Sequence, residues 1–123
     1  MEYLELLTRL RDFTKKTEEL KRALMTSSNA DAETQEVISQ KNAYMRFETE
    51  RRTLLDEAMR TIRTSSDPEM MKSLYFRRVL NIPWEKVPAS IPTDRSEMDL
   101  RIAAHKYVKS RFPQWTGEYS DCI

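Results

Sequence analysis

The chain has 123 residues, of which 33% are charged and only one is a glycine. A chain of this length forms one domain with a modest core. The scarcity of glycine argues against an all-β protein, whose tight turns depend on that residue. The formal net charge of +1 excludes neither nucleic acid nor protein partners, so its distribution along the chain is more informative than its sum.

Cysteine content and hydropathy point to the cytoplasm. The single cysteine, Cys122, cannot form a disulfide within one chain, which fits a reducing compartment. No apolar run approaches the ~20 residues that a membrane-spanning helix needs. Glu2 and Glu5 interrupt the region in which a signal peptide would be apolar. We therefore expect a cytoplasmic protein without membrane contact.

The residue types that enzymes use are scarce or isolated. One glycine cannot build a glycine-rich phosphate loop. The only histidine, His105, has no neighbours at metal-ligand spacing. Acidic pairs such as Glu18 and Glu19 lie among basic residues at helical spacing, which is typical of surface ion pairs. We expect no enzymatic activity, no metal and no cofactor.

The first half of the chain predicts two amphipathic helices. The first, from about residue 2 to about residue 25, carries one apolar stripe at alternating steps of four and three. That stripe consists of Leu6, Leu10, Phe13, Thr17, Leu20 and Leu24. The polar residues 26–31 predict a loop, and a second helix should run from about 32 to 64. Helices joined in this way form an antiparallel hairpin, and their stripes either cover only each other or also form a seam in a homodimer.

The second half predicts three shorter helices. Ser66 or Asp67 can cap the first of them, with Pro68 in its first turn, and Asn81 can end it. The next begins at Pro83, turns Trp84 and Val87 inward, and is kept short by Pro88 and Pro92. Thr93 or Asp94 can cap the last helix. Its inner face should consist of Leu100, Ala103, Ala104, Tyr107 and Val108.

These elements divide the all-α chain into an N-terminal helical hairpin at 1–66, a helix-turn-helix at 67–112 and a tail at 113–123. The hairpin is neutral, with 12 basic and 12 acidic residues, whereas the helix-turn-helix has 9 basic and 6 acidic residues. The tail has 2 acidic residues and no basic one. A local basic excess of this kind favours contact with phosphate.

Three runs in the second half resemble a known motif: Leu74-Tyr75-Phe76, then Trp84-Glu85-Lys86-Val87, then the helix from Arg101 to Val108. They resemble the helix-turn-helix of sigma-70 region 4 and, more closely, that of phage transcription regulators of the RinA/ArpU type. The resemblance covers roughly the last two fifths of the chain. It implies a phage or prophage sequence-specific DNA-binding transcription regulator, with double-stranded DNA as its partner and RNA polymerase or another host protein as a further one.

The resemblance also implies which residues meet DNA. The last helix would enter the major groove. The residues implied to face base edges are Arg95, Ser96, Asp99 and Arg101, and those implied to hold phosphates are Arg77, Arg78, Lys86, Lys106 and Lys109. The alternative is a small helical interaction protein that binds a host protein without contacting DNA.

Overall fold

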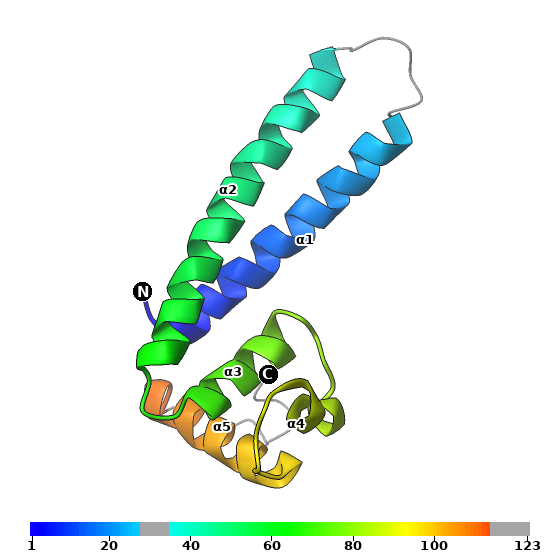
Figure 1. The fold of residues 1–123 in the computed structure, drawn as a ribbon. Coiled ribbons are helices and arrows are strands. Elements are labelled where there is room, and N and C mark those ends of the chain that lie inside the picture. The colour runs from blue at the N-terminus through cyan, green and yellow to red at the C-terminus, as the bar shows by residue number, and fades with distance from the viewer. Residues whose placement is uncertain (28–34, 114–123) are drawn as a thin grey trace.

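The protein is all-α in the residues described by its structure, a computed structural model that covers residues 1–27 and 35–113. Two long helices, α1 (Tyr3–Ser27) and α2 (Gln35–Thr64), form an antiparallel hairpin, and the shorter helices pack at one end of it (Figure 1). The shorter elements are α3 (Pro68–Arg78), the 3-10 turn η1 (Trp84–Lys86), α4 (Val87–Ser90) and α5 (Glu97–Arg111). The predicted fold class, a hairpin followed by a three-helix unit, is confirmed.

The core lies where the hairpin meets the shorter helices. In α1 the buried apolar residues all belong to the first two turns or so, and in α2 they belong to the last three turns. They are Tyr3, Leu4, Leu6, Leu7 and Leu10 of α1 and Leu54, Ala58 and Ile62 of α2. Farther along the predicted stripe of α1, Thr17 is also buried, whereas the apolar members beyond Leu10 are only half-buried.

Beyond this core the hairpin is held by lighter contacts. The rings of Phe13 and Phe47 lie 5.8 Å apart between centroids, and the Lys16 ammonium lies 5.3 Å from the Phe13 centroid. Such aromatic and cation–π contacts add about 0.5–1 kcal/mol each at partly exposed sites. Nearer the loop, Met25 and Met45 are 65% and 67% exposed. The loop end of the hairpin is thus less tightly packed than its base.

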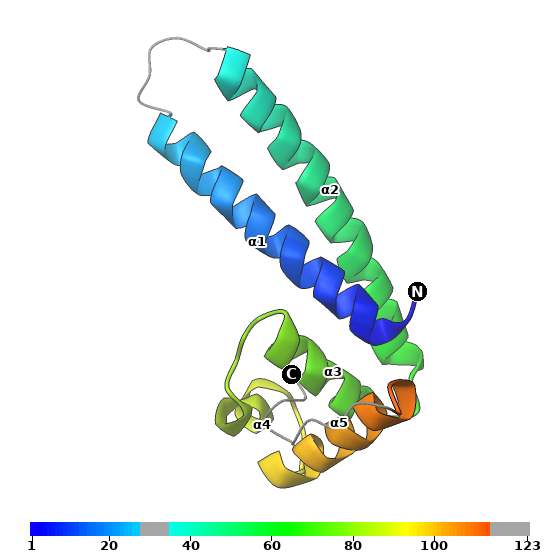
Figure 2. The same ribbon diagram turned by 180° about the vertical axis from the view of Figure 1, so that it is seen from behind.

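Helix α3 lies between the hairpin and α5, as two opposite views agree (Figures 1 and 2). Leu74 and Ser73 of this helix are fully buried. The Ser73 hydroxyl donates to the Glu69 carbonyl at 2.8 Å, so its burial leaves no unpaired donor. On the hairpin side, the Tyr3 hydroxyl donates to the Met71 carbonyl at 2.7 Å. This buried bond fixes the start of α1 against α3.

The predicted start of α3 is confirmed, whereas the predicted start of α5 is wrong. Asp67 caps α3 by accepting the Met70 N–H at 3.1 Å, with Pro68 in the first turn. At α5 the cap is Ser96, whose hydroxyl accepts the Asp99 N–H at 3.1 Å. Thr93, a predicted cap, instead accepts the Arg95 N–H at 3.1 Å. Its hydroxyl therefore closes a turn before the helix begins.

The remaining boundaries differ by a few residues. Helix α1 continues through Ser27, two residues past its predicted end. The Thr26 hydroxyl donates to the Arg22 carbonyl at 2.9 Å, a bond that is compatible with helix and removes the expected loop signal at that position. Residues 32–34 of the predicted second helix, like Cys122, lie outside the described residues.

The predicted short helix after Pro83 consists of η1 followed by one turn of α4. Trp84 and Val87 are buried, as predicted. Pro88 occupies the first turn of α4, where its missing N–H has no helical partner to lose. The backbone becomes extended at Ile91, directly before Pro92. Pro92 therefore limits this helix, and Pro88 does not.

The bond between Tyr3 and Met71 generates a prediction about stability. Tyr3→Phe should lower the free energy of unfolding by about 1 kcal/mol, because the buried Met71 carbonyl loses a hydrogen bond while packing is preserved. Chemical denaturation followed by circular dichroism measures this. Tyr44→Phe, a half-buried tyrosine of α2 outside this junction, is the matched control and should leave the unfolding midpoint unchanged. Equal losses in both variants would contradict the role given to Tyr3.

A second prediction concerns pH. Hydrogen bonds from Arg51, at 2.7 and 2.9 Å, lower the pKa of Glu48 from 4.5 to about 2. Glu48→Gln should cost about 1 kcal/mol of stability at pH 7. Since the folded-state pKa is depressed, the difference from wild type should be full above about pH 4.5 and vanish as the pH falls through about 2. Thermal melts across this range test it, with the exposed Glu50→Gln as control. A difference that does not depend on pH would exclude the ion pair as its cause.

Candidate nucleic-acid interface

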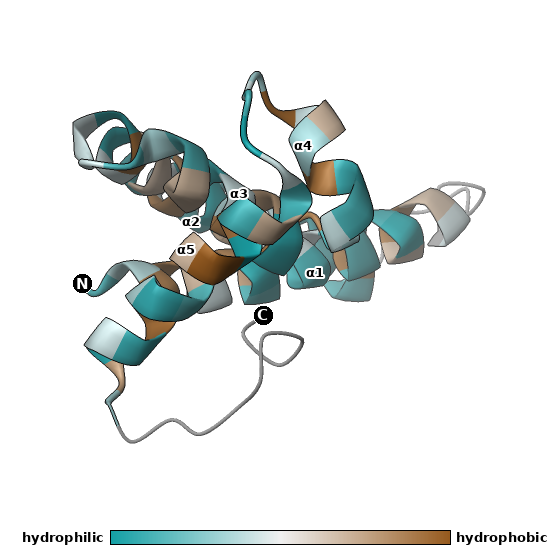
Figure 3. Cartoon of the chain, turned by 90° about the horizontal axis from the view of Figure 1, so that it is seen from below, coloured by the Kyte–Doolittle hydropathy of each residue, from teal (hydrophilic) through white to brown (hydrophobic). Residues whose placement is uncertain are grey.

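Helix α5 is the element that the resemblance assigns to DNA. Its inner side carries Leu100, Ala104 and Val108, all buried and four residues apart, so they form one face against α3 and η1. Seen from below, α5 lies across that side of the molecule, with hydrophobic and hydrophilic residues alternating along it (Figure 3). One face of α5 is therefore held by the core while the other is available to a partner.

A shallow hollow of about 300 Å³ lies on the outer side of α5. It is lined by Arg95, Asp99, Ile102, Ala103 and Lys106. Three of the nine predicted site residues, Arg95, Asp99 and Lys106, are thus brought together. The hollow combines one acceptor, two cationic donors and a small apolar surface, which are the side-chain chemistries that contact base edges and phosphates.

Arg95 is held by the carboxylate of Asp67, a residue that the sequence indicated only as a helix cap. Its guanidinium donates to Asp67 Oδ1 at 2.7 Å, and the two side chains are 30% and 33% exposed. The same oxygen accepts the Met70 N–H. Asp67 therefore caps α3 and holds the segment before α5 at once. Arg95 can reach a base only by exchanging this carboxylate for it.

Arg101 lies on the side of α5 that faces η1. Its guanidinium carbon is 5.9 Å from the centroid of the Trp84 ring, and its side chain is 24% exposed. Nη1 lies 4.0 Å from a carboxylate oxygen of Glu97, while the buried Nε finds no hydrogen-bond partner in residues 1–27 and 35–113. Arg101 thus packs over the Trp84 ring and does not line the hollow that takes in Arg95 and Lys106.

The other predicted residues are dispersed. Lys86 on η1 and Lys109 in the last turn of α5 are exposed, and the Ser96 hydroxyl is engaged as the cap. Arg77 and Arg78 line a different groove, of about 520 Å³, between α1 and the end of α3. This groove shares no residue with the hollow on α5. Of the predicted phosphate contacts, Arg77 and Arg78 therefore line this groove and only Lys106 lines the hollow on α5.

The charge of α5 changes along its length. Glu97 and Asp99 occupy its first turn, where acidic side chains complement the helix dipole. Lys106, Lys109 and Arg111 follow in its second half and are exposed. The beginning of α5 is consequently acidic or neutralised, and its end is cationic. A polyanion would be attracted to the end and repelled from the first turn.

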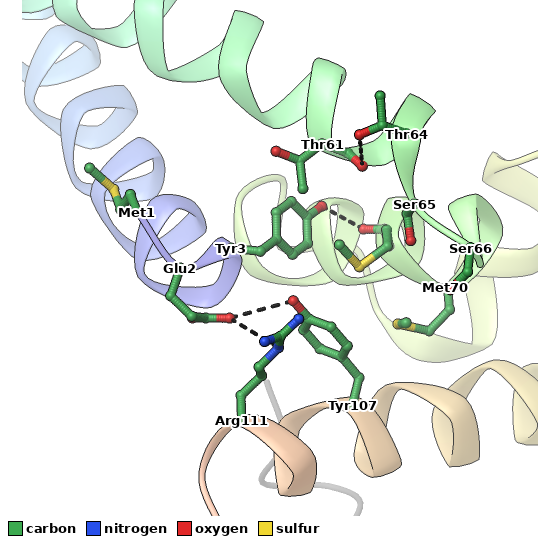
Figure 4. Close-up of a pocket in the computed structure, with 11 residues that line it drawn as sticks. Met1, Glu2, Tyr3, Thr61, Thr64, Ser65, Ser66, Met70, Tyr107 and Arg111 are labelled. Atoms are coloured by element: carbon green, nitrogen blue, oxygen red, sulfur yellow. Dashed lines mark hydrogen bonds and ion pairs between the residues drawn. The ribbon is translucent and has the colours of Figure 1, made fainter.

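A cavity of about 470 Å³, the junction cavity, lies between the end of α5 and the start of α1 (Figure 4). The Tyr107 hydroxyl donates to a Glu2 carboxylate oxygen at 3.4 Å, and Arg111 Nε lies 4.0 Å from that oxygen. Burial raises the pKa of Tyr3 and of Tyr107, so both phenols stay protonated and can donate. These contacts link the end of α5 to the start of α1. No local signal in the sequence pointed to Glu2 as a partner of α5.

Comparisons of the chain with protein-family models, with curated proteins and with solved structures return no match. In the part of the chain that the structure describes, no three or more His, Cys, Asp and Glu side chains gather where they could hold a metal ion. None of the described helices has both the length and the apolar character needed to cross a membrane. The site must therefore be interpreted from its own geometry.

The double role of Asp67 generates a prediction. Asp67→Ala should lower the free energy of unfolding by about 1–2 kcal/mol, because α3 loses its cap. Asp67→Asn keeps an oxygen for the Met70 N–H, and Arg95→Gln removes only a partly exposed ion pair, so each should cost less than about 1 kcal/mol. Urea denaturation of the three variants separates the cap from the pair. A loss in Arg95→Gln as large as in Asp67→Ala would contradict the capping role.

Proposed function

We propose that this protein is a DNA-binding transcription regulator of a phage or prophage, acting in the cytoplasm, that inserts α5 into the major groove. The observation that carries the proposal is the placement of Arg95, Asp99 and Lys106 around one hollow on the outer side of a helix whose inner side is buried. The resemblance to sigma-70 region 4 and to RinA/ArpU-type regulators supports the same assignment. On this proposal the chain binds and does not catalyse.

The dimensions of α5 suit this role. Its 15 residues span about 22 Å at 1.5 Å per residue, and the major groove is about 12 Å wide, enough to admit one helix. The helix is anchored at both ends, by Asp67 through Arg95 and by Glu2 through Tyr107. Anchored ends hold a reading helix at a defined angle, which base recognition requires.

The charge gradient along α5 orients the helix on DNA. Because Glu97 and Asp99 repel phosphate, the first turn belongs against base edges, and the cationic end belongs against the backbone. Asp99 can accept a hydrogen bond from a cytosine amino group. Arg95, once released from Asp67, can donate two bonds to a guanine. Lys106 and Lys109 then hold phosphates and set the register.

A second candidate function is binding to a host protein without DNA contact. The observation that favours it is the exposure of three apolar side chains of the hairpin: Met25 and Met45 are 65% and 67% exposed, and Ile38 is 38% exposed. Exposed apolar residues that lie close together mark protein contacts when they form a continuous patch. A stoichiometric complex with a host protein, formed by a chain that does not bind duplex DNA, would favour this candidate.

The DNA-binding proposal is tested by the salt dependence of binding to a random-sequence duplex, measured by fluorescence anisotropy. The double variant Lys106→Ala, Lys109→Ala should bind more weakly, and its slope of log K against log salt should fall by about 1.8, because each phosphate contact contributes about 0.9.

The matched control is Lys21→Ala, Arg22→Ala, which removes the same charge from exposed positions of α1. It should leave the slope within error of wild type. Absence of duplex binding at low salt, or an equal effect of the two double variants, would overturn the proposal.

A further inference from the structure

A second charged surface lies on the other side of α3 from α5. It is the groove of about 520 Å³ between α1 and the end of α3, which takes in Arg11 and Lys15 from α1 and Arg77 and Arg78 from α3. Glu18 is the one acidic side chain among its lining residues. Four cations against one acid, gathered from segments more than fifty residues apart in sequence, make a concave and strongly basic surface.

Two cations of this groove, Arg11 and Arg77, make only weak contacts with the protein's own side chains. Arg11 Nε lies 3.7 Å from a carboxylate oxygen of Asp12, and both side chains are half exposed. Arg77 Nη1 donates to the neutral Asn81 amide oxygen at 3.3 Å. Exposed pairs of the first kind contribute between 0 and about 1 kcal/mol, so an incoming carboxylate can replace them at little cost.

The rim of the groove adds an apolar contact. The chain turns sharply after α3 at Asn81, whose φ of 57° lies in the left-handed region that asparagine tolerates. The turn is closed by the Ile82 N–H, which donates to the Phe76 carbonyl at 3.1 Å. Leu80, directly before the turn, lines the groove and is 45% exposed. A defined backbone turn thus places an exposed leucine beside the cations.

The combination of a leucine with spaced cations selects between anionic partners. A phosphate backbone has nothing apolar to set against Leu80, and it carries a charge at every nucleotide, so it cannot present an uncharged group to Glu18. A partner helix with acidic and apolar positions can do both, because its sequence can place a leucine against Leu80 and an uncharged residue against Glu18. Arg11 and Lys15 are one helical turn apart on α1, so carboxylates at i and i+4 of a partner helix match their spacing. An apolar residue at i+3 of that helix lies on the same face and is available for contact with Leu80.

We propose that this groove binds an acidic, amphipathic helical segment of a partner protein, with its carboxylates on Arg11, Lys15 and Arg77 and an apolar side chain on Leu80. The groove and the hollow on α5 share no lining residue and are separated by α3. A partner held there leaves α5 accessible. The inference goes beyond DNA binding and does not depend on it.

The probe is a fluorescein-labelled synthetic peptide of about 16 residues, long enough to be helical, with glutamates four residues apart beside a leucine stripe. The full chain should bind it. The double variant Arg11→Glu, Lys15→Glu should weaken binding about tenfold or more, since two attractions become repulsions. Lys21→Glu, Arg22→Glu makes the same charge change elsewhere on α1 and should weaken binding less than twofold.

A second variant tests the same groove without reversing a charge, in case charge reversal disturbs folding. Leu80→Ser, at an exposed position, should weaken binding of the leucine peptide several-fold. It should leave unchanged the binding of a matched peptide that has alanine in place of leucine. Lys106→Ala, Lys109→Ala should not change peptide binding, which separates this result from that of the DNA experiment.

Three outcomes would overturn the proposal. The first is failure of the peptide to bind, and the second is an equal loss of peptide affinity in the two double variants of α1. The third is that single-stranded or duplex DNA binds the chain and loses more affinity than the peptide does in the Arg11→Glu, Lys15→Glu variant.

Discussion

The burial of α3 on two sides is the constraint on which the other elements depend. Leu74 and Ser73 are fully buried, and the Met71 carbonyl accepts a hydrogen bond from the Tyr3 hydroxyl of α1. An 11-residue helix is too short to be stable alone, so it exists because neighbours cover it. The hairpin covers one side and α5 the other. Any change in the position of α3 would therefore move both the base of the hairpin and α5.

This arrangement places two basic surfaces on opposite sides of α3. Arg77 and Arg78 end α3 and face the groove beside α1, whereas Lys106 and Lys109 lie on the outer side of α5. A single flat ligand does not reach both, because α3 lies between them. The two proposals follow from that division: a polyanion for the helix with a charge gradient, and a smaller amphipathic anion for the groove with a leucine on its rim.

The candidate site could be predicted from sequence only in part. Helical spacing identified the inner face of α5 and, by exclusion, most of its outer face. It did not identify the carboxylates that engage Arg95 and Tyr107, because Asp67 and Arg95 are 28 positions apart and Glu2 and Tyr107 are 105 apart. Nor did it place Arg101 over Trp84, a contact between α5 and η1, which are separated in sequence by α4 and a loop. Residue type indicated which side chains can bind an anion, but long-range pairing decided which of them are already engaged.

The sequence by itself determined the helices, their approximate ends and the inward position of Trp84 and Val87, because periodicity, proline and capping signals act between residues three or four apart. It indicated Thr93 or Asp94 as the cap of α5, which is wrong, because threonine, aspartate and serine side chains can all accept a backbone N–H and spacing alone did not single out Ser96. Only the tertiary structure decided that Ser96 caps the helix, that Asp67 serves two elements, and that Arg77 and Arg78 face α1. Those outcomes depend on which surfaces are buried together, and burial is a property of the whole folded chain rather than of any local segment.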